Sequence, residues 1–323
     1  MSSGSAATAM SPFDLTAGTD ADWAQIYRLY AGHRLRAAPA EAISAEPDYR
    51  SKLSHLPPSA RPAAWVHRGP SGEIAAFAWA VIHSASTVWI SDLVVAPEHR
   101  RQGHGRALIT NIQGYAESSG CRSIAGSVLT DAGRAFVAAL GGRESNRSRR
   151  SVWHPPLDPT LRRDLPDGYH LRSWIGPTPE ELLDSFVLAR EAINDAPRDS
   201  DIDSEVWTAQ RVREVERAAA DRGIELRISA AVTSDGTVAG FTDLRVTRTQ
   251  AHVDDTAVLA AHRNRGLAQA VKYESLRLLA EERPEVTTVS TSNDTTNAAM
   301  IAVNTKLGFT ETAVWTHVLL PVR

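Results

Sequence analysis

Apolar and polar residues follow the same order in the two halves of the chain. Each half has helical runs, then strand-like runs, and the last of these leads through a short turn into another helical run. The central strand-like runs span 63–68, 72–83 and 87–95 in the first half, and 224–233, 237–246 and 251–259 in the second. This order predicts an α/β fold of two domains with similar construction.

Proline marks the boundary between the halves. Residues 155–167 hold four prolines and a charged centre, as expected of a connection between domains. The sequence therefore predicts domains at residues 12–154 and 168–323, with residues 155–167 as the linker. The strands expected to close the two domains span 148–153 and 310–320.

A turn rich in arginine and glycine joins a strand-like run to a helical run in the second half. It reads His262-Arg263-Asn264-Arg265-Gly266-Leu267-Ala268. The first N–H groups of a helix have no partner inside the helix and the helix dipole is positive there, so this end attracts anions. Gly266 lets a phosphate approach the backbone, and the small Ala268 leaves the next turn uncrowded. The pattern predicts a phosphate site in this turn.

The first half contains a second copy of the turn. It reads Arg100-Arg101-Gln102-Gly103-His104-Gly105 and also lies between a strand-like and a helical run. A shift of 163 positions aligns Arg100 with Arg263. The same shift pairs Val95 with Val258 and Asp92 with Asp255. Two copies in the same context indicate a structural repeat.

The pattern Arg-x-x-Gly-x-Ala resembles the motif of the GNAT superfamily of acyl-CoA N-acyltransferases. Residues 297–309 resemble the second motif of that family, with Asn297, Gly308 and Phe309 at the family's spacing. The corresponding stretch of the first half, 134–142, keeps less of this motif. The resemblance implies two tandem GNAT-like domains of the actinobacterial type, each a mixed, mostly antiparallel sheet flanked by helices. The second half is favoured as the catalytic one.

The resemblance implies acetyl-CoA or a longer acyl-CoA as co-substrate, and no metal. A backbone N–H near Val258 would bind the thioester carbonyl and stabilise the charge that develops on its oxygen. The residues implied to bind the co-substrate in the second half are Val258, Arg263, Asn264, Arg265, Gly266, Leu267, Ala268 and Asn297. Those implied in the first half are Val95, Arg100, Arg101, Gly103 and Gly105.

One position departs from the family. The tyrosine that often protonates the leaving thiolate is replaced by Asn304 in the second half and by Val137 in the first. An asparagine cannot act as an acid, so water or another hydroxyl, such as that of Thr291 or Tyr273, would have to supply the proton. This departure also supports an alternative function, that of a non-catalytic acyl-CoA-binding or assembly protein.

Two aspartates on the strands before the turns are candidate general bases. An amine must be neutral to attack a thioester, and Asp255 or Asp92 could accept its proton directly or through water. The alternative is a structural carboxylate bonded to nearby backbone. Asp195, which follows the first predicted helix of the second domain, is a candidate contact to the acceptor; otherwise it caps a turn.

Composition narrows the function classes. The 35 basic and 38 acidic side chains nearly balance, which argues against a nucleic-acid or membrane partner. The single cysteine, Cys121, suits a reducing compartment, and no signal peptide or bilayer-spanning run is evident, so a soluble cytoplasmic protein is expected. The motifs of dinucleotide-binding domains, nucleotide P-loops, metalloproteases and serine hydrolases are absent.

The sequence thus predicts an N-acyltransferase. It would move an acetyl or longer acyl group from acyl-CoA to an amine of a small molecule, with an aminosugar-bearing natural product of antibiotic biosynthesis as one candidate acceptor. We expect a monomer or a homodimer.

Overall fold

The chain folds into two compact units. The structure, a computed structural model, describes residues 10–41, 43–54, 56, 59–82, 86–196, 204 and 206–322. The first unit holds the described residues up to Asn146 together with those from Trp315 onward. The second unit holds the described residues from Arg147 to Val314.

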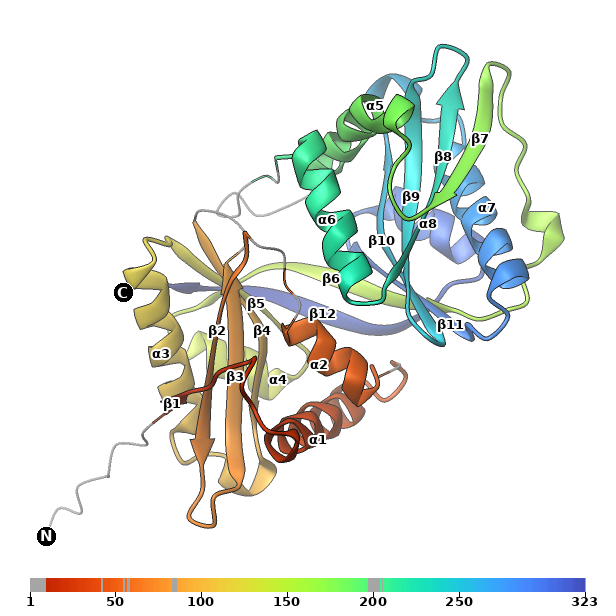
Figure 1. Cartoon of the computed structure of the whole chain (residues 1–323). Coiled ribbons are helices and arrows are strands. Elements are labelled where there is room, and N and C mark those ends of the chain that lie inside the picture. Colours follow the sequence, from red (N-terminus) through yellow and green to blue (C-terminus); the bar gives the residue numbers. More distant parts are fainter. Residues whose placement is uncertain are drawn as a thin grey trace, which may run out of the picture. The chain divides into compact units, whose positions relative to one another are not determined.

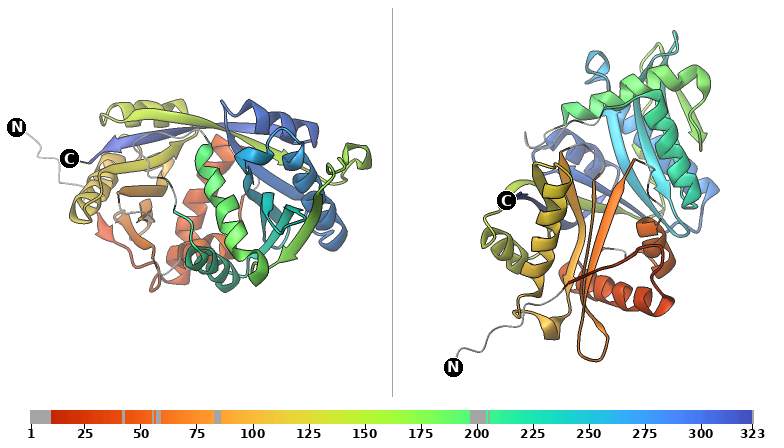
Figure 2. Two further views of the ribbon diagram at one scale, coloured as in Figure 1. Left: turned by 90° about the horizontal axis from the view of Figure 1, so that it is seen from above. Right: turned by 60° about the vertical axis from the view of Figure 1, so that its left-hand side comes forward.

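In the first unit a mixed sheet carries helices on both faces (Figure 1). The elements are β1 (Ser11–Pro12), α1 (Asp20–Ala37), α2 (Glu46–Ser54), β2 (Arg61–Arg68), β3 (Ile74–Ile82), β4 (Thr87–Val95), η1 (Pro97–His99), α3 (His104–Ser118), β5 (Ser123–Val128) and α4 (Asp131–Ala138). The strand order is β1-β2-β3-β4-β5-β12, in which β4 and β5 run parallel and the ladders of β1–β2, β2–β3, β3–β4 and β5–β12 are antiparallel. Figure 2 shows α1 and α3 on opposite sides of β3.

The second unit repeats this plan. Its elements are β6 (Arg143–Trp153), η2 (Pro159–Leu161), β7 (Tyr169–Ile175), α5 (Glu180–Glu191), η3 (Ala192–Asp195), α6 (Ala209–Asp221), β8 (Glu225–Thr233), β9 (Val238–Val246), β10 (Gln250–Val258), η4 (Ala260–His262), α7 (Leu267–Glu282), β11 (Thr288–Asp294), α8 (Ala298–Lys306) and β12 (Thr310–Pro321). The strand order is β12-β6-β11-β10-β9-β8-β7, and β10 and β11 are the parallel pair. The mixed, mostly antiparallel sheets predicted from the sequence are confirmed.

Local sequence signals fix several helix ends. Thr19 caps α1 in a capping box with Asp22, and Thr208 caps α6 through the N–H of Arg211. Thr178 looks like a cap for α5, but the N-cap is Pro179 and no side chain bonds there. The backbone N–H of Thr178 donates instead to the Glu216 carboxylate over 2.7 Å.

The two units exchange their closing strands. Residues 148–153 of β6 pair with β11 in the second unit, whereas residues 316–321 of β12 pair with β5 in the first. The sequence placed 148–153 with the first domain and 310–320 with the second, because alternation shows which residues form a strand and not which neighbour the strand takes.

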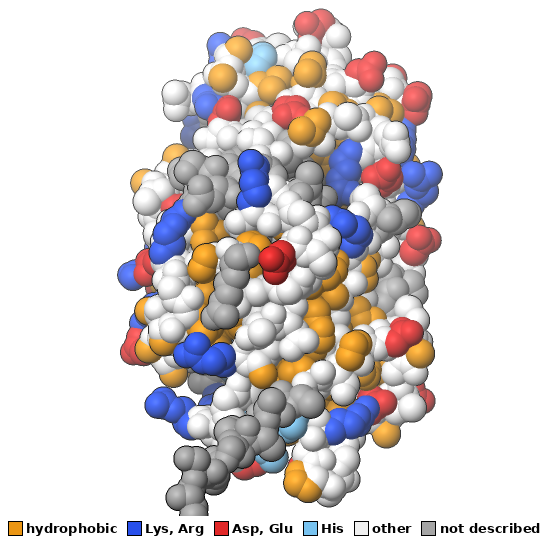
Figure 3. All heavy atoms as spheres, turned by 90° about the vertical axis from the view of Figure 1, so that its left-hand side faces the viewer, with side chains coloured by type: hydrophobic (Ala, Val, Ile, Leu, Met, Phe, Trp, Pro, Cys, Tyr) orange, Lys and Arg blue, Asp and Glu red, His pale blue; other side chains and the backbone are white. Residues whose placement is uncertain are grey.

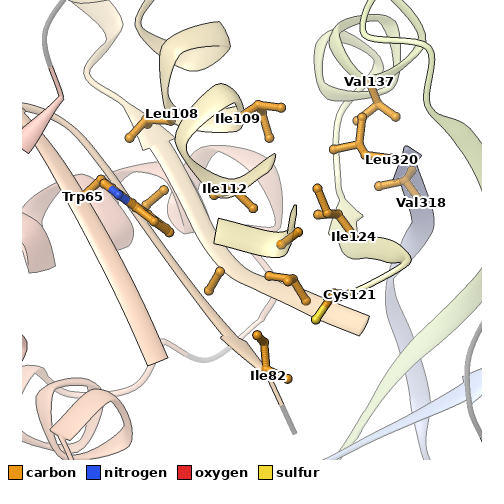
Figure 4. Close-up of a cluster of buried hydrophobic side chains, with 14 of the residues drawn as sticks. Trp65, Ile82, Leu108, Ile109, Ile112, Cys121, Ile124, Val137, Val318 and Leu320 are labelled. Atoms are coloured by element: carbon orange, nitrogen blue, oxygen red, sulfur yellow. The ribbon is translucent and has the colours of Figure 1, made fainter. Parts of the chain in front are cut away.

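The end of β12 supplies core side chains to the first unit. Val318 and Leu320 are buried in one cluster with Ile124 and Val137 (Figure 4). Full burial of one such side chain stabilises a fold by about 1.5–3 kcal/mol. The last strand is therefore an integral part of the first unit.

The predicted linker packs against α7. Leu157 and Leu161 contact the buried cluster around Leu276, and Leu165 contacts the cluster around Val271. The side-chain amide of Gln269 donates to the Leu161 carbonyl over 3.1 Å. These contacts fix the segment on the second unit.

The surface carries charges of both signs. On the face drawn in Figure 3, basic and acidic side chains are interspersed with apolar ones. Among the described residues, no helix combines the length and the apolar character that crossing a bilayer requires.

Candidate functional site

The turn before α7 has the backbone geometry of an anion site. Asn264 and Gly266 lie in the left-handed region, with φ of 61° and 81°, and Gly266 is the N-cap of α7. No side chain caps this helix end among the described residues, so its first N–H groups are available to a ligand. The N-terminal dipole adds positive potential at the same place.

The turn before α3 has the same geometry 163 residues earlier. Arg101 and Gly103 have φ of 62° and 90°, and Gly103 is the N-cap of α3, again without a side-chain cap. A non-glycine residue at positive φ is uncommon, so its recurrence at the same register shows that both turns take one conformation.

The first arginine of each turn points back toward the strand. The Nε of Arg263 donates to the Val258 carbonyl over 3.0 Å, and the Nε of Arg100 donates to the Val95 carbonyl over 3.1 Å. Arg263 also forms an ion pair with Asp195 of η3. These arginines brace the turns, and Asp195, the candidate acceptor contact, lies against Arg263.

The space beside the glycines differs between the copies. A Cβ added at Gly103 would have no heavy atom within 4 Å, whereas a Cβ added at Gly266 would collide with the guanidinium of Arg163. Arg265 and Arg163 are exposed and make no ion pair with any described residue. Gly105 lies against the ring of Phe136, whose nearest atom would be 3.2 Å from an added Cβ.

The other predicted binding residues are partly structural. Leu267 is buried, with Val258 packed against its cluster, and Ala268 is half-buried at the start of α7. Val95 packs against the main cluster of the first unit. Asn297 is the N-cap of α8, and its side chain accepts from the N–H of Met300 over 3.1 Å.

A bulge in β10 sets the position of Asp255. Val253 lies opposite Leu244 and Thr256 opposite Thr242, so Asp254 and Asp255 together face the single residue Asp243. The parallel ladder with β11 ends at Val253, directly before the bulge. β4 has a corresponding irregularity before Asp92, and its parallel ladder with β5 ends at Trp89.

Asp255 lies in a cluster of acidic and basic side chains with two residues that the sequence motifs do not include, Asp243 and Arg190. Its backbone N–H donates to Asp243 over 2.6 Å, and Arg190 lies 2.7 Å from Asp243 and 3.0 Å from the Asp255 carboxylate. Burial raises the pKa of Asp255 well above its usual range, and the neighbouring Asp243 and Asp254 raise it further, against the effect of Arg190. A carboxylate with a raised pKa is a stronger base than an ordinary one, which suits a general base.

The sequence does carry a signal for the two missed residues. Asp243 interrupts the apolar run of β9, and Arg190 falls at helical spacing from Leu183 and Phe186 on the buried side of α5. Both side chains are buried, and the Arg190 guanidinium also stacks on the Trp207 ring at 4.0 Å. Charged residues at core positions are expected to be paired, so each of the two indicates a buried partner of opposite charge without identifying it.

The carboxylates of this cluster could be read as metal ligands, because oxygens of Asp243, Asp254 and Asp255 lie within 4.8 Å of one another. Two arginines already compensate their charge, however. Arg190 bridges Asp243 and Asp255, and Arg245 pairs with Asp254 at 2.5 Å. The three carboxylates outnumber the two arginines, and Asp254 and Asp255 are still partly exposed.

Asp92 has a different environment. Its carboxylate accepts from the indole N–H of Trp79 over 2.8 Å and from the Tyr49 hydroxyl over 3.3 Å. Burial raises its pKa, while Lys52 and these hydrogen bonds oppose the rise. Two neutral donors from the core, the indole of Trp79 and the hydroxyl of Tyr49, fix this carboxylate. This environment favours a structural role for Asp92.

Asn304 lies buried in α8 where the family has tyrosine. Its Nδ2 donates to Asn293 over 2.5 Å, and its Oδ1 has no hydrogen-bond partner among the described residues. Tyr273 packs in the apolar cluster of α7, and Thr291 is buried at the end of the parallel ladder. Val137, the counterpart in the first half, is a core residue.

Comparison with known proteins identifies both halves. The model of the acetyltransferase (GNAT) family matches residues 23–141 and again residues 190–309. The mycothiol acetyltransferase of Tsukamurella paurometabola is 28% identical over 256 residues, covering 75% of this chain and 83% of the relative. A tandem GNAT protein from the clavulanic acid biosynthesis pathway has a similar structure, with a TM-score of 0.80, 24% identity and 98% of each chain covered. A GCN5-related N-acetyltransferase from Sphaerobacter thermophilus has a TM-score of 0.74 at 16% identity, covering 97% of this chain and 96% of its own.

Proposed function

The chain belongs to the acetyltransferase (GNAT) family, with two tandem domains, and from this premise we propose that it transfers an acyl group from acyl-CoA to an amine of a small molecule. We place the reaction in the second unit. The turn before α7 would bind the pyrophosphate of acyl-CoA through backbone N–H groups. Asp255 would accept a proton from the amine of the acceptor.

One observation carries this proposal. Asp255 lies in the bulge of β10, directly after the parallel ladder with β11 ends, and the same strand leads three residues later into Val258 and then the turn. A single strand, turn and helix therefore hold the candidate base and the candidate phosphate site in a fixed relation. The corresponding aspartate of the first unit, Asp92, is tied to Trp79 and Tyr49 instead.

The proposed chemistry is direct attack of the amine on the thioester. Asp255 takes one proton from the ammonium, the neutral nitrogen bonds to the carbonyl carbon, and the carbon–sulfur bond breaks. The thiolate leaves and takes a proton from water, since Asn304 cannot supply one. The nitrogen loses its second proton to solvent. The raised pKa of Asp255 suits the first of these transfers.

The acceptor is proposed as a cationic small molecule. Asp254 and Asp255 are partly exposed carboxylates, which favour a primary ammonium. Similarity to a mycothiol acetyltransferase makes the amine acceptor of that enzyme the first compound to test. Simple aminosugars and an aminosugar-bearing antibiotic complete the set.

Thiol release from acetyl-CoA, measured against these amines one at a time, tests the function. We expect release that depends on the amine, together with a product heavier by one acetyl group. Longer acyl-CoA donors measured in the same way define the acyl preference. If no amine of the set increases thiol release above the rate without acceptor, the proposed activity is wrong for this acceptor class.

Asn304 favours a second candidate function, a non-catalytic acyl-CoA-binding protein. Without the tyrosine, the second unit lacks the acid that often assists departure of the thiolate. Calorimetry distinguishes the two functions, because a binding protein takes up acetyl-CoA and shows no amine-dependent thiol release.

A further inference from the structure

Arg163 of the predicted linker lies on the phosphate turn of the second unit. Its guanidinium occupies the position that a Cβ on Gly266 would need. The side chain therefore reaches the N-terminus of α7 from outside the motif. Neither the strand before the turn nor the helix after it contributes this arginine.

The linker is fixed on both sides of Arg163. Before it, the Leu161 carbonyl accepts from Gln269 in the first turn of α7 over 3.1 Å. After it, Leu165 packs against the cluster that contains Leu267, the first residue of α7. The position of Arg163 is thus set by the helix whose N-terminus it covers.

A phosphate bound at this turn would be stabilised by an uncompensated positive side chain beside it. The guanidinium of Arg263 is already engaged by the Val258 carbonyl and by Asp195, so it is compensated. Arg163 makes no ion pair or hydrogen bond with any described residue. A planar guanidinium can donate two parallel N–H bonds to a phosphate, which makes arginine well suited to this ligand.

The turn of the first unit differs at this point. Among the described residues, no heavy atom lies within 4 Å of the position that a Cβ on Gly103 would take, so no arginine covers that glycine. Resting on the function proposed above, we propose that Arg163 binds the pyrophosphate of acyl-CoA at the Gly266 turn. This extra ligand gives the second unit a higher affinity for the co-substrate than the first unit has.

The test compares Arg163→Ala with Arg162→Ala in the full chain. Arg162 is a neighbouring exposed arginine whose Nε lies 3.8 Å from Asp164, so it controls for loss of a linker charge. Both variants are made in a Gly103→Asp background. This substitution blocks the turn before α3, so the measured binding is that of the turn before α7. Calorimetry with acetyl-CoA and competition by inorganic pyrophosphate are the readouts.

We expect Arg163→Ala to lower the affinity for acetyl-CoA at least tenfold, which corresponds to about 1.4 kcal/mol. The affinity for the competing pyrophosphate should fall in parallel. Arg163→Lys should recover part of the lost affinity. Arg162→Ala should stay within twofold of the background. Acetyl-pantetheine, which has no pyrophosphate, should be used equally well with and without Arg163.

Three results would overturn the proposal. Unchanged affinity in Arg163→Ala would show that the arginine only rests on the turn. Tighter binding would show that it blocks the turn. Equal losses with acetyl-CoA and acetyl-pantetheine would show that it holds the linker. Failure of the proposed function is distinguishable, because the background protein itself would then release no thiol in the presence of amines.

Discussion

The carboxylate of Asp243 accepts a hydrogen bond from the backbone N–H of Asp255 over 2.6 Å. A bulge leaves backbone N–H and C=O groups of β10 without their usual partners on the neighbouring strand. The Asp243 side chain accepts a hydrogen bond from one of these N–H groups. Arg190 reaches both carboxylates from α5. The position and the proton affinity of Asp255 are therefore set together by one buried cluster.

The first prediction concerns this proton affinity. Because the pKa of Asp255 is raised well above its ordinary value, turnover should increase as the pH rises through that raised pKa, where the carboxyl becomes a base. Asp255→Asn removes the basic oxygen and keeps the shape. We expect about 10²–10⁴-fold slower turnover, partly recovered at high pH where the free amine is more abundant. A pH–rate profile with acetyl-CoA and an accepted amine provides the measurement.

Asp92→Asn serves as the control in the first unit and should change turnover much less. Acetyl-CoA affinity should be nearly the same in both variants. Unchanged turnover in Asp255→Asn at neutral pH would leave Asp255 with a structural role only.

The second prediction separates the two turns. An aspartate at Gly266 would place a carboxylate and extra volume where the pyrophosphate is expected, at a positive φ that favours glycine. Gly266→Asp should reduce acetyl-CoA affinity at least tenfold, or about 1.4 kcal/mol by calorimetry. Gly103→Asp should leave turnover intact. The opposite result, with loss of turnover only in Gly103→Asp, would place the reaction in the first unit.

The third prediction concerns Asp195. Since it pairs with Arg263 at the surface, Asp195→Asn should change acetyl-CoA binding only a few-fold, within the range of about 0–1 kcal/mol for exposed ion pairs. The KM for the acceptor should not change. A raised acceptor KM at constant acetyl-CoA affinity would instead support the expectation, from the sequence, that Asp195 contacts the acceptor.

The fourth prediction concerns Lys272, which is buried in α7 with its Nζ 3.4 Å from Thr256 and 5.6 Å from the centre of the Phe309 ring. Burial lowers its pKa to about 7, although Asp243 opposes the shift. The unfolded chain keeps this proton up to the ordinary value of 10.5. The folded state therefore carries the whole cost of burying the charge below about pH 7, and this cost is relieved as the pH rises toward 10.5.

Lys272→Met should accordingly increase the free energy of unfolding more at pH 6 than at pH 9.5, as measured by urea denaturation. Lys306→Met, an exposed lysine at the end of α8, should show no such difference between the two pH values. Equal effects of Lys272→Met at both pH values would mean that the amine is already solvated or paired when folded.

Much of the fold follows from local pattern. The strand before each turn, the turn and the helix after it were predicted within a few residues, because alternation, glycine at positive φ and helical spacing are local signals. The acetyltransferase (GNAT) family was also identified from Arg263, Gly266 and Ala268 together with Asn297 and Phe309. Which residues bind acyl-CoA and which one is the base remain predictions.

The sequence could not reveal features that depend on tertiary partners. Asp243 and Arg190 meet from a strand and a helix 53 residues apart, so no motif spacing connects them. The position of Arg163 depends on how the linker packs, which its prolines do not specify. The choice of neighbours for β6 and β12 depends on which strand edges remain open once the rest has formed.

The exchange of β6 and β12 has a consequence for the order of events during synthesis. Residues 316–321 of β12, which cover the edge of β5, are synthesised after the rest of the first unit and after most of the second. The nascent first unit therefore has an unpaired strand edge, open to pairing with another chain, until β12 has been synthesised. We expect chains that are arrested before residue 315 to be cleaved by protease within the first unit, and chains that include β12 to resist. Each unit therefore completes its sheet only with a strand from the other half of the sequence.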